Sequence, residues 1–309
     1  MRIWLKRIAW GLFGLLVVGV IALAIFLLPA HLQIRSITPE PPTRAELQAL
    51  MSAPERPVAI SYFVTSDQVA DGNLLGHTTF VIEWEDGRIL LIDAGMSEDK
   101  AREFADRISM LTGGGPATVR GTAASILGDE IGRVAGVGFT HLHEDHVQGL
   151  EGICGAATQQ LTIVQTRDQA TEHNHLTESM ATMIEDSTCA DALVLAPETR
   201  TTGEFPGIGI YPLAGHTPGS TMFAIPVGDR LWLLTGDISN SREALIGNQP
   251  KGFLYSYLFV PEDEARLEQL RLLLTELDED EQFTAIVSHD PEAIAASGMP
   301  LWQMPANDN

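Results

Sequence analysis

One pattern constrains the fold more than any other feature of the sequence. An apolar strand ends in an aspartate, and a later strand ends in a histidine. The run 89–92 is apolar throughout and is followed at once by Asp93. A strand expected over 134–139 then leads into His141. A short run without polar positions is typical of a strand that is buried on both faces.

The second half of the sequence repeats this order. The apolar run 231–234 leads to Asp237, and a strand expected over 283–287 leads into His289. Helical sequence separates the two strands in each half. We therefore expect two related β-sheet halves, each covered by helices, that meet edge to edge and whose strand-end loops converge on one site.

The N-terminal segment has the properties of a membrane anchor. Residues 8–28 carry no charge, and at ~1.5 Å rise per residue a helix of this length reaches about 31 Å, close to the hydrocarbon thickness of a bilayer. Because Arg2, Lys6 and Arg7 precede the run, the positive-inside rule places the N-terminus in the cytoplasm and the body on the outer, periplasmic or extracellular side. The alternative is secretion after cleavage of a signal peptide, although such peptides usually have an apolar run of only ~7–15 residues.

Three segments are expected along the chain. Residues 1–35 form the membrane anchor, residues 36–57 a Pro-rich stalk, and residues 58–309 the folded body. The prolines of the stalk favour extended backbone that spaces the body from the membrane. Within the stalk, Thr43 and Glu46 match a capping box, which predicts a short helix there.

The charge balance limits the partners of the chain. Asp and Glu number 41 and Lys and Arg number 19, for a formal net charge of −22. A polyanion such as nucleic acid would be repelled by this surface, so no nucleic-acid partner is expected. The expected partners are the lipid bilayer, through residues 8–28, and a small-molecule substrate that is neutral or cationic.

The two cysteines, Cys154 and Cys189, are too few for a disulfide scaffold and lack the spacing of a structural zinc site. On the outer side of a membrane they can form a disulfide, and two buried thiols explain the sequence equally well.

The stretch 140–146 has the highest density of chemically active side chains. It places three imidazoles and two carboxylates within six consecutive residues, and imidazole nitrogens and carboxylate oxygens are ligands that suit Zn²⁺. His141 and His143, two residues apart just after a strand, point to one side. Asp145 and His146 can turn toward a second position, so this loop can serve two adjacent metal ions.

This stretch resembles the H-x-H-x-D-H motif of the metallo-β-lactamase superfamily of hydrolases. The motif stands here as His141, His143, Asp145 and His146, with Gly149 beyond it. Further positions match in the family's order over roughly residues 58–291, namely Asp93, His216, Asp237 and His289. The resemblance implies an α/β fold, a four-layer αββα sandwich, which the N-terminal transmembrane helix precedes.

The resemblance also implies a dinuclear metal centre. The first metal ion would be held by His141, His143 and His216, the second by Asp145, His146 and His289, and Asp237 would bridge them. Two divalent ions about 3.5–4 Å apart lower the pKa of a shared water. Zn²⁺ is the expected ion, and Fe²⁺ or Mn²⁺ also suit nitrogen and oxygen ligands. By the same resemblance, Asp93 would hold a ligand histidine through its other ring nitrogen.

The implied activity is that of a metal-dependent hydrolase, similar in motif to lactonase and glyoxalase II members. Metal-bound hydroxide would attack a small ester, lactone or thioester, with Asp145 and Asp237 as catalytic residues. The lactonases resemble one another in having a tyrosine three residues after the bridging aspartate, where this chain has Asn240. Tyr255 or Tyr257 could supply the hydroxyl. A metal-dependent phosphodiesterase and a non-catalytic metal-containing binding or sensor module are the alternatives.

Three other histidines receive a weaker assignment. His77 begins a strand, and we expect a structural or rim-lining role for it. His173 and His175 are expected at a solvated helix start, with a place in the substrate pocket as the alternative.

Overall fold

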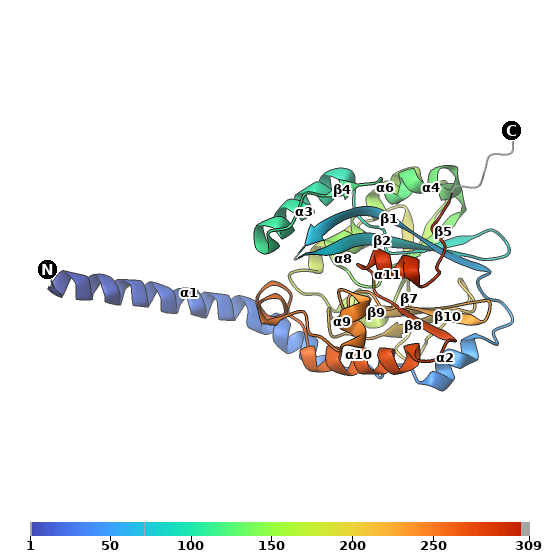
Figure 1. Ribbon diagram of the computed structural model, residues 1–309. Helices are drawn as coiled ribbons and strands as arrows, with labels where there is room; N and C mark the ends of the chain where they lie inside the picture. Colours follow the sequence, from blue (N-terminus) through green and yellow to red (C-terminus); the bar gives the residue numbers. More distant parts are fainter. Residues whose placement is uncertain (1, 71, 304–309) are drawn as a thin grey trace.

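Two mixed β-sheets form the centre of the molecule (Figure 1). The computed structural model describes residues 2–70 and 72–303. The larger sheet has the strand order β4-β1-β2-β3-β5-β6-β7 and the smaller sheet the order β11-β10-β9-β8. The strands are β1 (Ala59–Ala70), β2 (Asn73–Glu83), β3 (Ile89–Ile92), β4 (Thr118–Val119), β5 (Val134–Gly138), β6 (Leu161–Gln165), β7 (Ala190–Val194), β8 (Gly209–Pro212), β9 (Thr221–Val227), β10 (Arg230–Leu234) and β11 (Phe283–Ile286).

Helices cover the outer face of each sheet. Figure 1 shows α3, α4 and α6 over the larger sheet, and α9 and α10 over the smaller one. The helices are α1 (Arg2–Ser36), α2 (Arg44–Leu50), α3 (Glu98–Thr112), α4 (Ala123–Leu127), α5 (Glu144–Val147), α6 (Leu150–Ala156), α7 (Arg167–Thr171), α8 (Glu178–Glu185), α9 (Arg242–Ile246), α10 (Glu264–Asp278) and α11 (Pro291–Ala296), with a 3-10 helix η1 (Gly128–Arg133) and a π-helix η2 (Tyr255–Phe259).

The repeated sequence pattern corresponds to the same strand arrangement in both sheets. β2 and β3 pair antiparallel, and β3 pairs parallel with β5. In the smaller sheet, β9 and β10 pair antiparallel, and β10 pairs parallel with β11. The aspartate and the histidine of each half therefore follow neighbouring parallel strands and lie at the carboxyl ends of those strands, on the same side of their sheet.

The two sheets stack face to face, which corrects the expectation that they meet edge to edge. In β3, Ile89 and Leu91 pack against the helix layer, whereas Leu90 and Ile92 pack in a core that includes residues of the smaller sheet. The helix layer covers only one face of β3. Burial of each large aliphatic side chain contributes about 1.5–3 kcal/mol, so the other face is stabilised by the second sheet. Helix, sheet, sheet and helix layers result, as the resemblance implied.

Apolar alternation in the sequence predicts strands over 58–65 and 79–85, and the β1–β2 hairpin is longer than this. β1 continues through the buried polar residues Ser66 and Gln68, and β2 begins at Asn73, several residues before Thr79. Polar side chains interrupt the alternation there, so periodicity does not reveal the strand. The extension carries His77 to the end of the sandwich where the predicted site residues lie.

Among the described residues, one helix is long and apolar enough to cross a membrane, by its length and composition. It covers Trp4–Ser36 of α1, with a mean hydropathy of 2.9 in its most apolar window. A membrane span and an N-terminal signal sequence both fit such a helix. Its last turns lie against the body, where Ile34 is fully buried and Gln33 Nε2 donates a hydrogen bond to Glu172.

The segment expected to be a spacer instead packs against the body. The predicted capping box is present, with Thr43 Oγ1 accepting from the backbone N–H of Glu46 at the start of α2. Leu47 and Leu50 on one face of α2 are buried in the core between the smaller sheet and α10. An apolar stripe on a helix is stabilised by burial, and this effect outweighs the extending influence of the prolines.

Cys154 in α6 and Cys189 before β7 are joined by a disulfide bond, with their Cα atoms 5.5 Å apart. Of the two alternatives left open by the sequence, the structure contains the disulfide. It ties the helix layer to the edge of the larger sheet.

Candidate metal centre

The predicted site residues meet at one end of the sandwich, in the loops that follow the strands. The motif 140–146 follows β5, and His216 follows β8. Asp237 follows β10 and His289 follows β11. The seven predicted ligands come from four separate segments of the chain, and all of them are buried except His143, which is half-buried.

His141, His143 and His216 direct one ring nitrogen each toward a common point. His141 Nε2 lies 3.0 Å from His143 Nδ1, and His216 Nε2 lies 3.2 Å from the same atom. Burial and the neighbouring imidazoles hold the pKa of His141 well below its usual range and lower that of His143 to about 3. These two rings are therefore neutral at physiological pH, with lone pairs that could hold a metal ion.

A second group of donor atoms lies beside the first. His146 Nε2 and His289 Nε2 are 3.3 Å apart, and Asp145 Oδ2 lies 3.6 Å and 3.4 Å from them, respectively. These are the three residues predicted for a second metal position.

Asp237 contacts both groups. Its Oδ2 lies 3.6 Å from His216 Nε2 and 3.1 Å from His289 Nε2, and its Oδ1 lies 3.7 Å from His146 Nε2. Burial alone would raise the pKa of Asp237, but His289 and the other imidazoles lower it well below its usual value. The carboxylate is therefore ionised and lies between the two groups.

The donor set fits divalent metal ions. Imidazole nitrogens converge to about the van der Waals distance, and Asp237 Oδ1 is buried without a hydrogen-bond partner among the described residues. Burying such an atom unpaired costs about 1–3 kcal/mol. A cation held between the nitrogen and oxygen atoms would pair with all of them, and nitrogen and carboxylate oxygen are ligands for Zn²⁺ and related ions.

Comparison with protein-family models matches residues 72–278 to the metallo-beta-lactamase superfamily. The chain belongs to this superfamily. Its members include metal-dependent hydrolases that commonly bind divalent metals, so the prediction of a metal-dependent hydrolase is confirmed, as are the predicted family and fold. Comparison with curated protein sequences gives no match.

Solved structures with the same fold include lactonases. An N-acyl homoserine lactone hydrolase with the product N-hexanoyl-L-homoserine at its metal centre is 17% identical, with a TM-score of 0.57 over 78% of this chain and 96% of that chain. A quorum-quenching N-acyl homoserine lactone lactonase is 18% identical, with a TM-score of 0.57 over 78% and 95%. A probable metal-dependent hydrolase from Staphylococcus aureus is 17% identical, with a TM-score of 0.54 over 76% and 90%. At these identities the likeness shows the fold.

In this metallo-beta-lactamase fold, Asp93 contacts a predicted ligand histidine on the side of the ring that faces away from the donor nitrogens. As the resemblance implied, it contacts a predicted ligand through the outer ring nitrogen: its Oδ2 lies 2.9 Å from His146 Nδ1. The backbone N–H and the hydroxyl of Thr140 both donate to the Asp93 carboxylate, at 2.8 Å each. Asp93 has a left-handed backbone, with φ 61°, a conformation that costs energy and that these contacts stabilise.

The glycine of the motif is required for close packing. A Cβ atom at Gly149 would lie 2.1 Å from the carbonyl oxygen of Ala94, and the Gly149 N–H donates to the carbonyl of Gly95. This contact joins the motif loop to the loop that contains Asp93.

A buried cluster on the outer side of His216 was missed by sequence analysis. Glu262 Oε1 accepts a hydrogen bond from His216 Nδ1 at 2.6 Å, and Lys251 Nζ lies 3.1 Å from the same carboxylate oxygen. Burial alone would raise the pKa of Glu262, but Lys251 and His216 lower it to about 2. Glu262 and Lys251 are distant from the motif along the chain, and no fixed spacing marks residues that contact a ligand from outside.

His77 lies deeper than the rim. Its side chain is buried, with Nε2 3.8 Å from Asp145 Oδ2 and Nδ1 2.9 Å from Ser66 Oγ. Together with Asp145 and His289 it forms a further group of convergent donor atoms. His173 and His175 lie instead between α7 and α8, and the His175 ring is 4.6 Å from that of Phe26 in α1.

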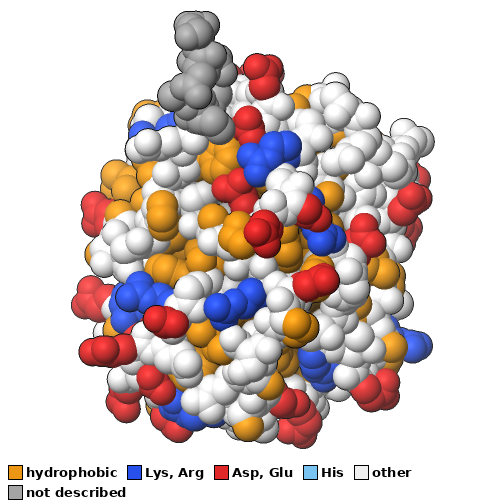
Figure 2. Space-filling model, turned by 90° about the vertical axis from the view of Figure 1, so that its right-hand side faces the viewer, with side chains coloured by type: hydrophobic (Ala, Val, Ile, Leu, Met, Phe, Trp, Pro, Cys, Tyr) orange, Lys and Arg blue, Asp and Glu red, His pale blue; other side chains and the backbone are white. Residues whose placement is uncertain are grey.

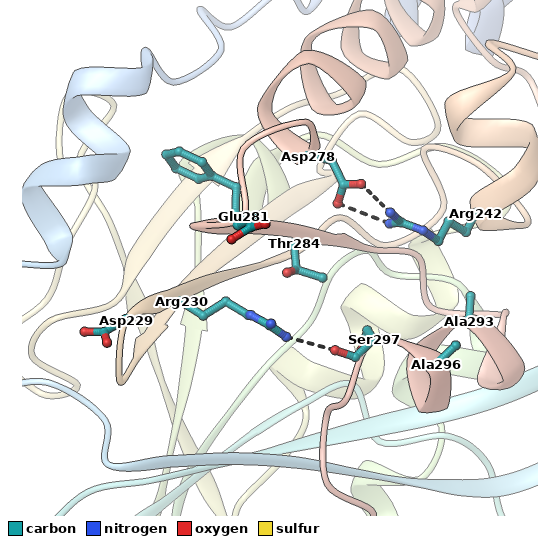
Figure 3. Close-up of a pocket in the computed structure, with 10 residues that line it drawn as sticks. Asp229, Arg230, Arg242, Asp278, Glu281, Thr284, Ala293, Ala296 and Ser297 are labelled. Carbon is teal, nitrogen blue, oxygen red and sulfur yellow. Dashed lines mark hydrogen bonds and ion pairs between the residues drawn. The ribbon is translucent and has the colours of Figure 1, made fainter.

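A separate pocket lies beside β10, β11 and α11 (Figure 3). Its two arginines have partners within it: Arg242 pairs with Asp278, and Arg230 donates to the carbonyl of Ser297 at 2.8 Å. None of the seven predicted ligands lines this pocket. Because the candidate metal ligands lie elsewhere, this pocket is a poor candidate for the reaction site.

Proposed function

We propose that the chain is a membrane-anchored dinuclear hydrolase of a small ester, lactone or thioester. The observation that carries the proposal is the position of Asp237, whose carboxylate contacts nitrogen donors of both groups. A carboxylate in this place can bridge two ions, whereas a mononuclear site has no need of the second group. In this proposal residues 1–35 are the anchor, residues 36–57 connect it to the body, and residues 58–309 form the hydrolase domain.

The proposed ligands are those of the two groups. The first ion is assigned to His141, His143 and His216, the second to Asp145, His146 and His289, and the bridge to Asp237. When bound, two divalent ions, of which Zn²⁺ is expected, lower the pKa of a water molecule and polarise the substrate carbonyl. Fe²⁺ and Mn²⁺ suit the same donor atoms.

Asp145 and Tyr255 supply proton chemistry to the reacting atoms in this proposal. Asp145 orients the attacking water and returns a proton to the leaving group. Burial raises the pKa of Tyr255 well above its usual value, and Glu262, Asp237 and Asp145 raise it further. The phenol therefore stays protonated and can donate to the substrate oxygen. Asn240, the position of the lactonase tyrosine, is exposed, which supports Tyr255 as the donor.

The proposed location is the outer side of a membrane. α1 is long and apolar enough to span the bilayer, and the basic residues before it favour a cytoplasmic N-terminus. The disulfide between Cys154 and Cys189 fits an oxidising compartment. The acidic body favours a neutral or cationic substrate.

Metal analysis combined with a substrate panel tests the proposal. The purified full chain is expected to contain about two metal equivalents and to hydrolyse at least one carboxyl ester, lactone or thioester. His143→Ala is expected to abolish turnover while the circular dichroism spectrum is unchanged. A protein that binds no metal, or a His143→Ala variant with full activity, would contradict the proposal. Turnover of phosphodiesters alone would select a phosphodiesterase, and tight ligand binding without turnover would select a sensor.

A further inference from the structure

A short segment of the body exposes several large apolar side chains. Within residues 253–259, called the apolar segment below, Phe253 is 70% exposed and Leu254 61% exposed. Leu258 and Phe259 are exposed as well. Contiguous apolar side chains on the surface of a soluble protein commonly mark a contact with a partner or a membrane.

The apolar segment lies beside the end of α1. The His31 ring stacks on Tyr257 with centroids 5.5 Å apart, and His31 Nε2 donates to the Tyr257 carbonyl at 3.1 Å. Figure 1 shows the segment, in orange, where α1 meets the body. Exposed apolar side chains of α1 continue as far as Leu28 and Leu32, so both the helix and the adjacent segment expose apolar side chains.

A second apolar group lies on the same side of the body, at the tip of the β1–β2 hairpin. Val69 near this tip is exposed, as are Met110 and Leu111 at the end of α3. The N–H of Gly115, just after α3, donates to the carbonyl of Val69 at 3.0 Å, which joins the two elements. In Figure 1 the hairpin points toward the side from which α1 projects.

The opposite face of the body has a different character. On the face that points away from α1, charged side chains of both signs are spread among the hydrophobic ones (Figure 2). A protein held at a bilayer by α1 would therefore turn its apolar groups toward the membrane and this charged face toward water.

The apolar segment is also tied to the candidate metal centre. It lies between Lys251 and Glu262 in the chain, both of which contact His216. Ser256 Oγ, within the segment, donates to Glu262 Oε2 at 2.6 Å. His77, on the other wall of the centre, belongs to the hairpin that carries the second apolar group. The metal centre thus lies between two apolar groups that face the same way.

We propose that the apolar segment and the second apolar group, made up of Val69, Met110 and Leu111, rest in the surface of the bilayer, and that the enzyme draws its substrate from the membrane. The substrate class is an amphiphile, whose apolar chain stays among the lipids while its ester, lactone or thioester group reaches the metal centre. This inference rests on the proposed function, since α1 is taken as the anchor and the centre as hydrolytic. Aromatic and aliphatic side chains on one face are typical of contact with the interface of a bilayer.

Depth measurement tests the membrane contact without any need for turnover. Because the two native cysteines are joined in a disulfide, a single cysteine introduced by Phe253→Cys can be spin-labelled in the full chain and reconstituted with Zn²⁺ in phosphatidylcholine vesicles. The label is expected to be more accessible to oxygen, which concentrates in lipid, than to a water-soluble nickel chelate. The control is Val58→Cys, which is 55% exposed at the far end of β1 and should show the reverse. A water-accessible label at both positions would overturn the proposed contact.

A chain-length comparison tests the substrate class. In the double variant Leu254→Ser/Phe259→Ser, kcat/KM for para-nitrophenyl palmitate in phosphatidylcholine vesicles should fall about tenfold or more, because apolar area at the interface is lost. Turnover of the water-soluble para-nitrophenyl acetate should stay unchanged. Val58→Ser, as the matched control, should leave both rates unaltered. Equal effects of the double variant and the control on the long ester would overturn the inference. If the unmodified chain cleaves no ester, lactone or thioester, the proposed function fails while the spin-label result still decides the membrane contact.

Discussion

Glu262 Oε1 lies 2.6 Å from Nδ1 of His216, and both side chains are fully buried. The carboxylate fixes the tautomer of the ring, so that Nε2 keeps its lone pair and faces His143. A hydrogen bond of this kind raises the basicity of a metal ligand and limits the rotation of its ring.

Glu262→Gln should weaken metal binding while leaving the fold intact. The amide cannot accept with the strength of a carboxylate, so we expect affinity at the first position to fall about 10–100-fold, measured by competition with a chelator. Glu268→Gln makes the same change at an exposed position of α10 and serves as the control. Equal metal affinity in both variants would show that Glu262 does not support His216.

Metal binding should depend more steeply on pH at the second position than at the first. Burial alone would lower the pKa of His146, but the carboxylates of Asp93 and Asp145 raise it to about 10. Below that pH the metal-free ring carries a proton that an ion must displace. Burial alone would lower the pKa of His289, another proposed ligand of the second ion, but Asp237 and Asp145 raise it as well. Affinity for that ion should therefore fall by at least about tenfold for each pH unit lost. His141 and His143 are already neutral and release no proton.

The affinities for the first and the second ion can be measured by titrating the metal-free protein with Zn²⁺ between about pH 6 and 9. This interval lies below the raised pKa of His146. Calorimetry in buffers of different ionisation enthalpy counts the released protons. Identical pH slopes for the two ions would contradict this assignment.

Gly149→Ala should destabilise the body. The added methyl group would lie 2.1 Å from the carbonyl oxygen of Ala94, and because that atom is backbone, the two loops must move apart. We expect a loss of about 1–3 kcal/mol in the free energy of unfolding, measured by urea denaturation. Gly152→Ala lies in α6 with no atom within 4 Å of the new methyl group. It should be neutral or stabilising by up to about 1 kcal/mol, and equal losses in both variants would contradict the packing role of Gly149.

The N-terminal helix should remain on the mature protein. Intact mass measurement of the membrane-extracted chain is expected to give the full length, and alkaline carbonate should not release it, because α1 buries an apolar span of bilayer length. A soluble product that begins after residue 30 would identify a signal sequence instead.

Local sequence features predicted the elements that hold the site. The apolar runs at β3 and β10 predicted these strands, and the motif 140–146 indicated a metal site. The resemblance to the superfamily implied the fold class and the full group of candidate ligands. These signals are local: burial on two faces requires apolar residues at every position, and a metal loop concentrates its ligands in a few residues. Polar stretches carried less information, so the ends of β1 and β2 were missed.

The sequence by itself therefore predicted seven candidate metal ligands, and it determined that an apolar segment long enough to span a bilayer as a helix lies near the N-terminus. Only the tertiary structure decided that α2 packs into the core and that Glu262, Lys251 and His77 adjoin the centre. The structure also decided between the edge-to-edge arrangement expected from the strand pattern and the face-to-face stacking implied by the resemblance. It also placed the apolar segment beside α1. These relationships join residues far apart in the chain, and no local pattern encodes them, because they depend on how the loops close over the two sheets.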